Sequence, residues 1–399
     1  MIVALHDELL DAARAATGLE DFGERSFEEG LEILTRALRT EARLNATGQA
    51  TLRGLLVGLL SQRLQVEDWY RRHPEIDDEQ IVAPLIGLGL PRTGSTALSF
   101  LLAEDPQARS LRMWEANAPC PPPCVGEGIE DRIDRGRTEV EFRTKTSPRR
   151  GRLVPASATG PTECQSLMAL DFKAQYFQAF AHIPSYSKWL LESADLTTTY
   201  RYELRVLKLL QWGFPNQPWR LKCPTHLLFL DQLAEVFPDA RLVMTHRDPA
   251  EVMVSVADLY AAVARSYSDD IDLPYLGALN VEHWSVGMER ALAFRDNGGD
   301  SRFYDIDFRA MQRDPIGEVT GLYTWLGEPV TPAFGAGMRR WWEENAQQRE
   351  ANVHPDPATF GLDIDEIRPL FAAYTTRAAQ WTTRETSTSG AEGLNHHGD

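Results

Sequence analysis

The sequence feature that most constrains the fold is an apolar run that leads into a turn with a glycine at each end. Residues 81–88 are almost uniformly apolar, as in a buried parallel strand, although Pro84 disfavours strand pairing over the first of them. Residues 89–96 then read GLPRTGST, and apolar residues at helical spacing predict a helix from near Gly94. A turn of this kind directs backbone N–H groups and the positive helix end at one spot. The segment predicts an anion-binding nest, with a ligand-free glycine turn as the alternative.

Two further strands are predicted beyond this turn. Residues 219–222 precede a predicted helix from about 226 to 236, and residues 240–245 precede one from about Pro249 to Tyr260. Strands that alternate with helices indicate a parallel sheet with crossover helices. The fold class predicted is therefore α/β.

The chain divides into three regions by composition. Residues 1–80 carry apolar residues at helical spacing and predict a helical region, either a cap or a dimerisation element, so a homodimer stays open. Residues 81–380 form the α/β domain, with 119–161, rich in Pro, Gly and charge, as a loop-like excursion over the active face. Residues 266–276 also resemble a loop, and the polar segment 382–399 predicts a disordered tail.

Charge, hydropathy and cysteine usage exclude several classes of function. The net charge of −17 argues against a nucleic-acid partner. The N-terminus lacks the pattern of a signal peptide, and the apolar runs are too short for a membrane span. The four cysteines are too sparse for a disulfide scaffold, and the three prolines between Cys120 and Cys124 disfavour a zinc pair. We therefore expect free thiols in the cytoplasm and no metal.

The turn itself supplies the side chains for a first anion site. Ser95 and Thr96 offer hydroxyl groups at the helix start beside Thr93 and Gly94, and Arg92 offers a bidentate guanidinium. A nucleotide triphosphatase loop has the same glycine spacing but carries a lysine that reaches the β- and γ-phosphates, and Ser95 occupies that position here. A kinase or NTPase is therefore the disfavoured rival.

A second anion site is predicted after the third strand. Arg247 ends that strand, Pro249 suits the first turn of the next helix, and Ser255 lies eight positions beyond the arginine. Two helical turns place the serine where it can share a ligand with the arginine. The plainer alternatives are that Arg247 forms a surface ion pair and that Ser255 is an exposed serine on the helix. Two phosphate sites on one sheet suggest a nucleotide phosphorylated at both ends.

These two patterns together resemble the PAPS-dependent sulfotransferases, and in particular their bacterial branch. The resemblance covers most of residues 18–375, and the stretches that carry it are residues 160–164, 221–227, 237–240 and 314–315. It implies a P-loop-like three-layer sandwich and 3′-phosphoadenosine 5′-phosphosulfate (PAPS) as sulfuryl donor, with PAP as product and a small hydroxylated molecule as acceptor. It also implies that residues 92–96 bind the 5′-phosphosulfate and that Arg247 and Ser255 bind the 3′-phosphate.

Sulfuryl transfer needs a donor for the leaving oxygen and a base for the acceptor. Lys222 ends a strand beside the turn and suits the first role. For the base, His226 has an intrinsic pKa near neutrality, and Glu115 resembles the proposed base of tyrosylprotein sulfotransferases. We rank these two almost level, with Glu163 third, because a structural role in its Gly-Pro-x-Glu turn is the plainer interpretation.

Two features leave alternatives open. Sulfotransferases usually place a basic loop on the 3′-phosphate. Residues 349–355 of this chain offer only Arg349 as a substitute for that loop. A non-catalytic nucleotide-binding protein therefore stays as a second rival. Aromatic residues could line an apolar acceptor pocket or could pack in the core; they are Tyr176, Phe177, Phe180, Tyr186, Trp189 and Trp212.

Overall fold

A five-stranded parallel sheet forms the centre of the molecule. The computed structural model describes residues 2–124, 129–153, 156–214, 217–346 and 355–383. The strand order is β2-β3-β1-β4-β5, and every pairing is parallel. The strands are β1 (Leu85–Gly89), β2 (Arg109–Ser110), β3 (Trp219–Lys222), β4 (Arg241–His246) and β5 (Phe303–Asp307). The predicted α/β class is confirmed, and β1 begins directly after Pro84.

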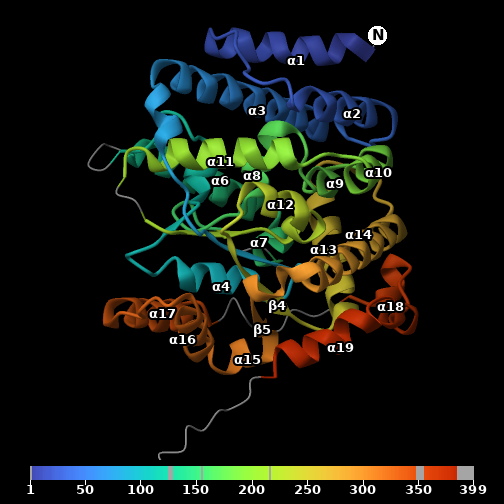
Figure 1. The fold of residues 1–399 in the computed structure, drawn as a ribbon. Helices are drawn as coiled ribbons and strands as arrows, with labels where there is room; N and C mark the ends of the chain where they lie inside the picture. The colour runs from blue at the N-terminus through green and yellow to red at the C-terminus, as the bar shows by residue number, and fades with distance from the viewer. Residues whose placement is uncertain (1, 125–128, 154–155, 215–216, 347–354, 384–399) are drawn as a thin grey trace, which may run out of the picture.

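Helices cover both faces of the sheet because alternate strand residues point to opposite sides. Leu85, Val243 and Ile306 pack in one apolar cluster, under α4 (Ser95–Leu102), α15 (Phe308–Arg313), α16 (Pro315–Leu326) and α17 (Pro332–Glu344). Ile86 and Leu242 pack in the other, larger cluster, to which α11 (Thr197–Gln211), α13 (Pro249–Ala264) and α14 (Leu273–Phe294) contribute. The arrangement is the predicted three-layer sandwich (Figure 1).

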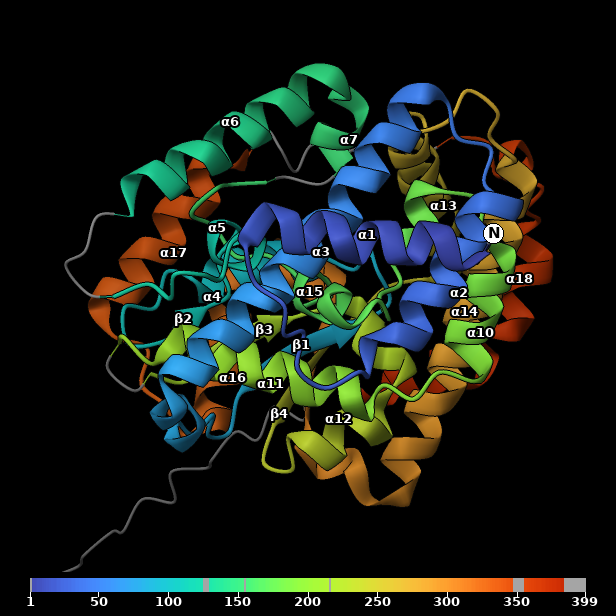
Figure 2. The ribbon, with the colours of Figure 1, turned by 90° about the horizontal axis from the view of Figure 1, so that it is seen from above.

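The N-terminal helices cover the larger cluster from outside. They are α1 (Ile2–Thr17), α2 (Phe27–Thr40) and α3 (Ala46–Arg72), and in Figure 2 α1 lies across α3. Leu31 and Leu60 are fully buried in the same core as the sheet residues. The buried Arg63 donates to the carbonyl oxygens of Phe22 and Leu170, at 2.9 and 3.1 Å, and so joins the two parts of the chain. These helices therefore share the core of the α/β domain.

The segment predicted as a loop-like excursion contains helices instead. After α5 (Met113–Asn117) the chain forms α6 (Glu130–Thr146) and α7 (Pro148–Leu153), which run along one side of the molecule in Figure 2. The helix α6 is charged around most of its surface, so it shows no apolar stripe from which a helix could be predicted. The 266–276 loop is also shorter than expected, because Asp272 accepts a hydrogen bond from the Tyr275 N–H and α14 begins at Leu273.

The remaining helices connect these layers. The helix expected after β3 is divided into a 3₁₀ turn, η3 (Pro224–Leu228), and α12 (Leu230–Val236). The others are α8 (Gln165–Met168), α9 (Phe177–Phe180), α10 (Pro184–Glu192), α18 (Ile364–Leu370) and α19 (Ala372–Trp381). In the part of the chain that the structure describes, no helix has the length and apolar character needed to cross a membrane. Arg349 and all but the first two residues of the predicted tail lie outside the described residues.

Candidate active site

The turn after β1 has the backbone geometry of an anion nest. Gly89 and Gly94 have φ values of 124° and 89°, which side chains disfavour, and a Cβ on Gly89 would lie 2.9 Å from the carbonyl oxygen of Thr245. Arg92 also has a positive φ, 64°, although it is not glycine. Such strained residues persist where the surrounding structure holds them, and they gather at ligand sites. The helix α4 starts at Ser95 and directs its positive end into the turn.

Within the turn, the side chains of Thr93 and Thr96 point to different partners. The buried Thr93 hydroxyl donates to the carbonyl oxygen of Leu90 at 2.7 Å and lies 2.6 Å from the hydroxyl of Thr245. Its hydroxyl therefore holds the turn together. The Thr96 hydroxyl instead accepts from Lys222 Nζ at 3.4 Å.

The two predicted anion sites adjoin each other. Arg92 Nε donates to Ser255 Oγ at 3.2 Å, and Arg247 Nη1 donates to the carbonyl oxygen of Arg92 at 3.2 Å. Burial and the neighbouring Arg247 lower the pKa of Arg92. Arg247 also pairs with Glu251 at 3.0 Å, whereas among the described residues Arg92 has no carboxylate in ion-pair contact. Two guanidinium groups at one edge of the sheet form a local positive region in an acidic protein, which fits a phosphate ligand.

The helix α7 covers this positive region. Arg92 Nη1 donates to the carbonyl oxygen of Leu153 at 2.5 Å, and Arg149 forms a bidentate pair with Asp258 on α13, at 2.7 and 2.8 Å from its two oxygens. The excursion therefore lies over the predicted active face, as helices rather than as a loop.

A buried network of His246, Asp305 and Arg295 lies behind Arg247 and was not predicted from the sequence. His246 Nε2 lies 2.8 Å from Asp305, which also forms a bidentate pair with Arg295 at 2.8 Å for each bond. Burial raises the pKa of Asp305, but hydrogen bonds from Arg295 and His246 outweigh it and hold the pKa below the ordinary value. The network fixes the end of β4 and therefore the backbone position of Arg247, the residue that follows this strand. No local sequence pattern predicts it, because its members come from β4, β5 and η4 (Arg295–Gly299).

Lys222 and Glu163 meet beside the turn. Lys222 Nζ lies 2.6 Å from Glu163 Oε1, and the lysine side chain is 7% exposed while the glutamate is 36% exposed. The segment of Glu163 is held against the sheet, since Thr162 N–H donates to Leu111 O at 2.8 Å and Cys164 N–H donates to Lys222 O at 3.1 Å. Glu163, which the sequence ranks third, is the candidate base that the structure places against Lys222.

The two candidates ranked above Glu163 lie in other surroundings. Glu115 is 1% exposed, pairs with the buried Arg109 at 2.8 Å and accepts from the Arg112 N–H at 3.1 Å. His226 is fully buried, its ring bonds Tyr200 at 3.1 Å, and burial lowers its pKa to about 3. Glu115 is thus engaged as the partner of a buried arginine, and His226 is enclosed by protein.

The aromatic residues considered for an acceptor pocket mostly pack against one another. Tyr176 lies 4.6 and 4.9 Å from the rings of Phe177 and Phe180. Tyr186 is fully buried and donates to Phe172 O at 2.9 Å, and Trp189 packs 5.7 Å from its ring. Trp212 lies elsewhere, 4.8 Å from the ring of His73. The set therefore does not line one pocket.

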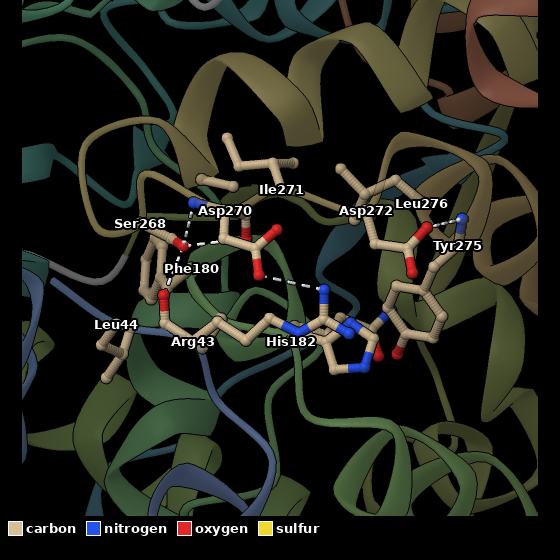
Figure 3. A pocket seen from close by; sticks show the side chains of 13 residues that line it. Arg43, Leu44, Phe180, His182, Ser268, Asp270, Ile271, Asp272, Tyr275 and Leu276 are labelled. Atoms are coloured by element: carbon tan, nitrogen blue, oxygen red, sulfur yellow. Dashed lines mark hydrogen bonds and ion pairs between the residues drawn. The ribbon is translucent and has the colours of Figure 1, made fainter.

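A cavity next to these aromatic residues is too small for an acceptor. It lies between Phe180, His182 and Tyr275, beside the ion pair of Arg43 with Asp270 (Figure 3). Its volume is about 20 Å³, and one water needs roughly 10–15 Å³ on this measure. The cavity has room for one or two water molecules.

Comparisons with known proteins agree with the fold. A model of the sulfotransferase family matches residues 84–332. Sulfotransferase STF9 from Mycobacterium avium, a solved structure, is 32% identical with a TM-score of 0.86 over 93% of this chain and 96% of that one. Sulfotransferase STF1 from Mycobacterium tuberculosis H37Rv is 30% identical with a TM-score of 0.77 over 92% and 98% of the two chains.

A curated relative matches over a shorter stretch. Omega-hydroxy-beta-dihydromenaquinone-9 sulfotransferase Stf3 of Mycobacterium bovis is 30% identical over 179 residues, which are 42% of this chain and 44% of that protein. The match spans less than half the length of that relative. The family model, in contrast, covers more than half of the present chain and includes the turn, Lys222 and Arg247. The chain therefore belongs to the sulfotransferase family.

Proposed function

We propose that this sulfotransferase uses PAPS as its donor and moves the sulfuryl group to a hydroxyl of a small acceptor. The observation that carries the proposal is the position of Lys222, whose ammonium contacts both Thr96 in the anion-binding turn and Glu163. A nucleotide phosphorylated at both ends fits the adjoining pair of positive sites, with residues 92–96 at its 5′ end and Arg247 and Ser255 at its 3′-phosphate.

In the proposed step the acceptor oxygen attacks sulfur in line with the leaving oxygen, an S–O bond forms, and the S–O bond to the phosphate breaks. Glu163 accepts the proton of the acceptor hydroxyl. Lys222 donates a hydrogen bond to the bridging oxygen, where negative charge develops as PAP leaves. Arg92 and the turn amides hold the phosphosulfate so that the reacting atoms stay aligned.

For the acceptor we propose a small hydrophobic alcohol or phenol. The support is the named activity of the relative Stf3, which acts on an omega-hydroxylated dihydromenaquinone. A sulfate-transfer screen over hydroxylated small molecules, with mass detection of PAP and of the sulfated product, tests this. Transfer only to sugars would contradict it.

Calorimetry separates this function from its rivals. We expect PAP to bind tightly without Mg²⁺ and ATP to bind weakly with or without it. A kinase or NTPase requires Mg²⁺-dependent ATP turnover, against which the absence of a lysine at Ser95 argues. A non-catalytic nucleotide-binding protein binds PAP but transfers no sulfate to any acceptor in the screen. Binding of ATP alone would therefore refute the proposal in favour of a kinase or NTPase. Binding of PAP without transfer would refute it in favour of a non-catalytic protein.

Replacement of Arg247 should act on the 3′-phosphate alone. We expect Arg247→Met to weaken PAP binding about tenfold to a hundredfold, because charge-assisted hydrogen bonds to the phosphate are lost. Binding of AMP, which lacks the 3′-phosphate, should change little. Calorimetry with both nucleotides measures the difference, and an equal loss for PAP and AMP would refute the assignment of Arg247 to the 3′ end.

A further inference from the structure

Three metal-ligating side chains converge in the core, outside the proposed transfer site. Cys164 precedes α8, Glu203 lies on α11 and His226 lies in η3. Each is fully buried, and the Cys sulfur, a carboxylate oxygen and a ring nitrogen all lie within 4.8 Å of one another. Among the described residues, these three side chains form a group with the spacing of a metal site.

The donor atoms of this group have few hydrogen-bond partners outside the group among the described residues. Nε2 of His226 is buried without a hydrogen-bond partner among the described residues, and the buried carboxylate of Glu203 is hydrogen-bonded by the Cys164 thiol of the same group. Leaving a buried polar group unpaired costs about 1–3 kcal/mol, and more for a charged group. Ligand atoms of three such side chains within 4.8 Å of one another indicate a ligand that they share.

The arrangement around His226 fits a metal ligand. Its Nδ1 lies 3.1 Å from the Tyr200 hydroxyl, so this bond orients the ring and leaves Nε2 for the group. Metal-binding histidines are commonly held in this way through their other nitrogen. With one carboxylate oxygen of Glu203, the three side chains offer one sulfur, one nitrogen and one oxygen ligand, all donor types that zinc accepts, and a water molecule would complete the tetrahedron.

We propose that Cys164, Glu203 and His226 bind a zinc ion in the core of this protein. Binding displaces the thiol proton of Cys164 to solvent, and the thiolate and the carboxylate together balance the two positive charges of the ion. A buried site of zero net charge avoids the cost of an unpaired buried ion.

The location gives the ion a positioning role. Cys164 follows Glu163 in the chain, and His226 lies in the turn that begins two residues after Lys222. The zinc would join both segments to α11, which lies under the N-terminal helices. It would act by bracing the backbone and not by touching substrate.

Metal content and cobalt spectroscopy test the site without any activity assay. The full chain, produced in medium supplemented with zinc, is expected to retain about one zinc per chain after dialysis, measured by elemental mass spectrometry. Produced with Co²⁺ instead, it is expected to show the thiolate-to-cobalt charge-transfer band of a tetrahedral site.

Variants identify the ligands. Cys164→Ala should abolish the charge-transfer band, and Glu203→Gln, which keeps the side-chain shape, should lower the zinc content strongly. The matched control is Cys223→Ala, which removes another fully buried thiol outside the group and should leave the band intact. Only traces of metal and no band in the unaltered chain would overturn the proposal and leave a neutral core cluster. A band that survives Cys164→Ala, or that disappears with Cys223→Ala, would overturn the ligand assignment.

Discussion

Glu163→Gln is expected to lower kcat by roughly two to four orders of magnitude, the range over which a positioned general base acts. The amide keeps the size of the carboxylate and can still accept a hydrogen bond from Lys222, which lies 2.6 Å from Glu163 in the present chain. It cannot accept the proton of the acceptor hydroxyl. Affinity for PAP should change little, because Glu163 faces the acceptor side in the proposed step. Single-turnover sulfate transfer and calorimetry measure the two quantities.

Glu115→Gln is the matched comparison, since the sequence ranks Glu115 above Glu163. The variant leaves the buried Arg109 without its anionic partner, and breaking such a pair costs about 3–5 kcal/mol. We therefore expect a clear loss in the free energy of unfolding by urea but turnover within about tenfold of the unaltered chain at temperatures where the variant is folded. The reverse result, near-normal turnover for Glu163→Gln and a loss of orders of magnitude for Glu115→Gln, would restore Glu115 as the base.

The parts of the fold that depend on local pattern could be predicted from the sequence. The strand at 219–222 and the helix from Pro249 occur where the apolar pattern and the turn residues predict them. Two short segments at the ends of parallel strands must lie at one sheet edge, so the proximity of Arg247 to Arg92 also follows from the topology. The helix α6 could not be predicted because its charged residues leave no apolar face.

The candidate base could not be ranked from sequence because its partners come from distant segments. Glu163 reaches Lys222 only because residues 162–164 bond to Leu111 and to Lys222 itself. Glu115 matches a family pattern, but whether a carboxylate is free depends on the arginine that folds against it. The Cys164, Glu203 and His226 group is similar: three separate elements build it, and no metal-binding spacing appears in the sequence, which predicts no metal.

Lys222→Met should lower kcat by about 10²–10³, the effect of removing one donor from a developing charge. Methionine keeps most of the length of the side chain, which is buried beside the turn, so the loss reports the ammonium and not the packing. Lys222→Arg retains the charge and should recover part of the rate. The charge on the bridging oxygen appears as the bond to sulfur breaks, so PAPS binding should change much less than kcat.

A double-variant cycle with Glu163→Gln decides whether the pair acts as one unit. Because Lys222 and Glu163 contact each other and serve the same transition state, the combined variant should be little worse than the poorer single variant. Independent losses that multiply would mean that the two residues act at separate steps. If Lys222→Met weakens PAPS binding and kcat/KM by the same factor with kcat unchanged, the lysine binds the donor in its ground state, and a different group must stabilise the leaving oxygen.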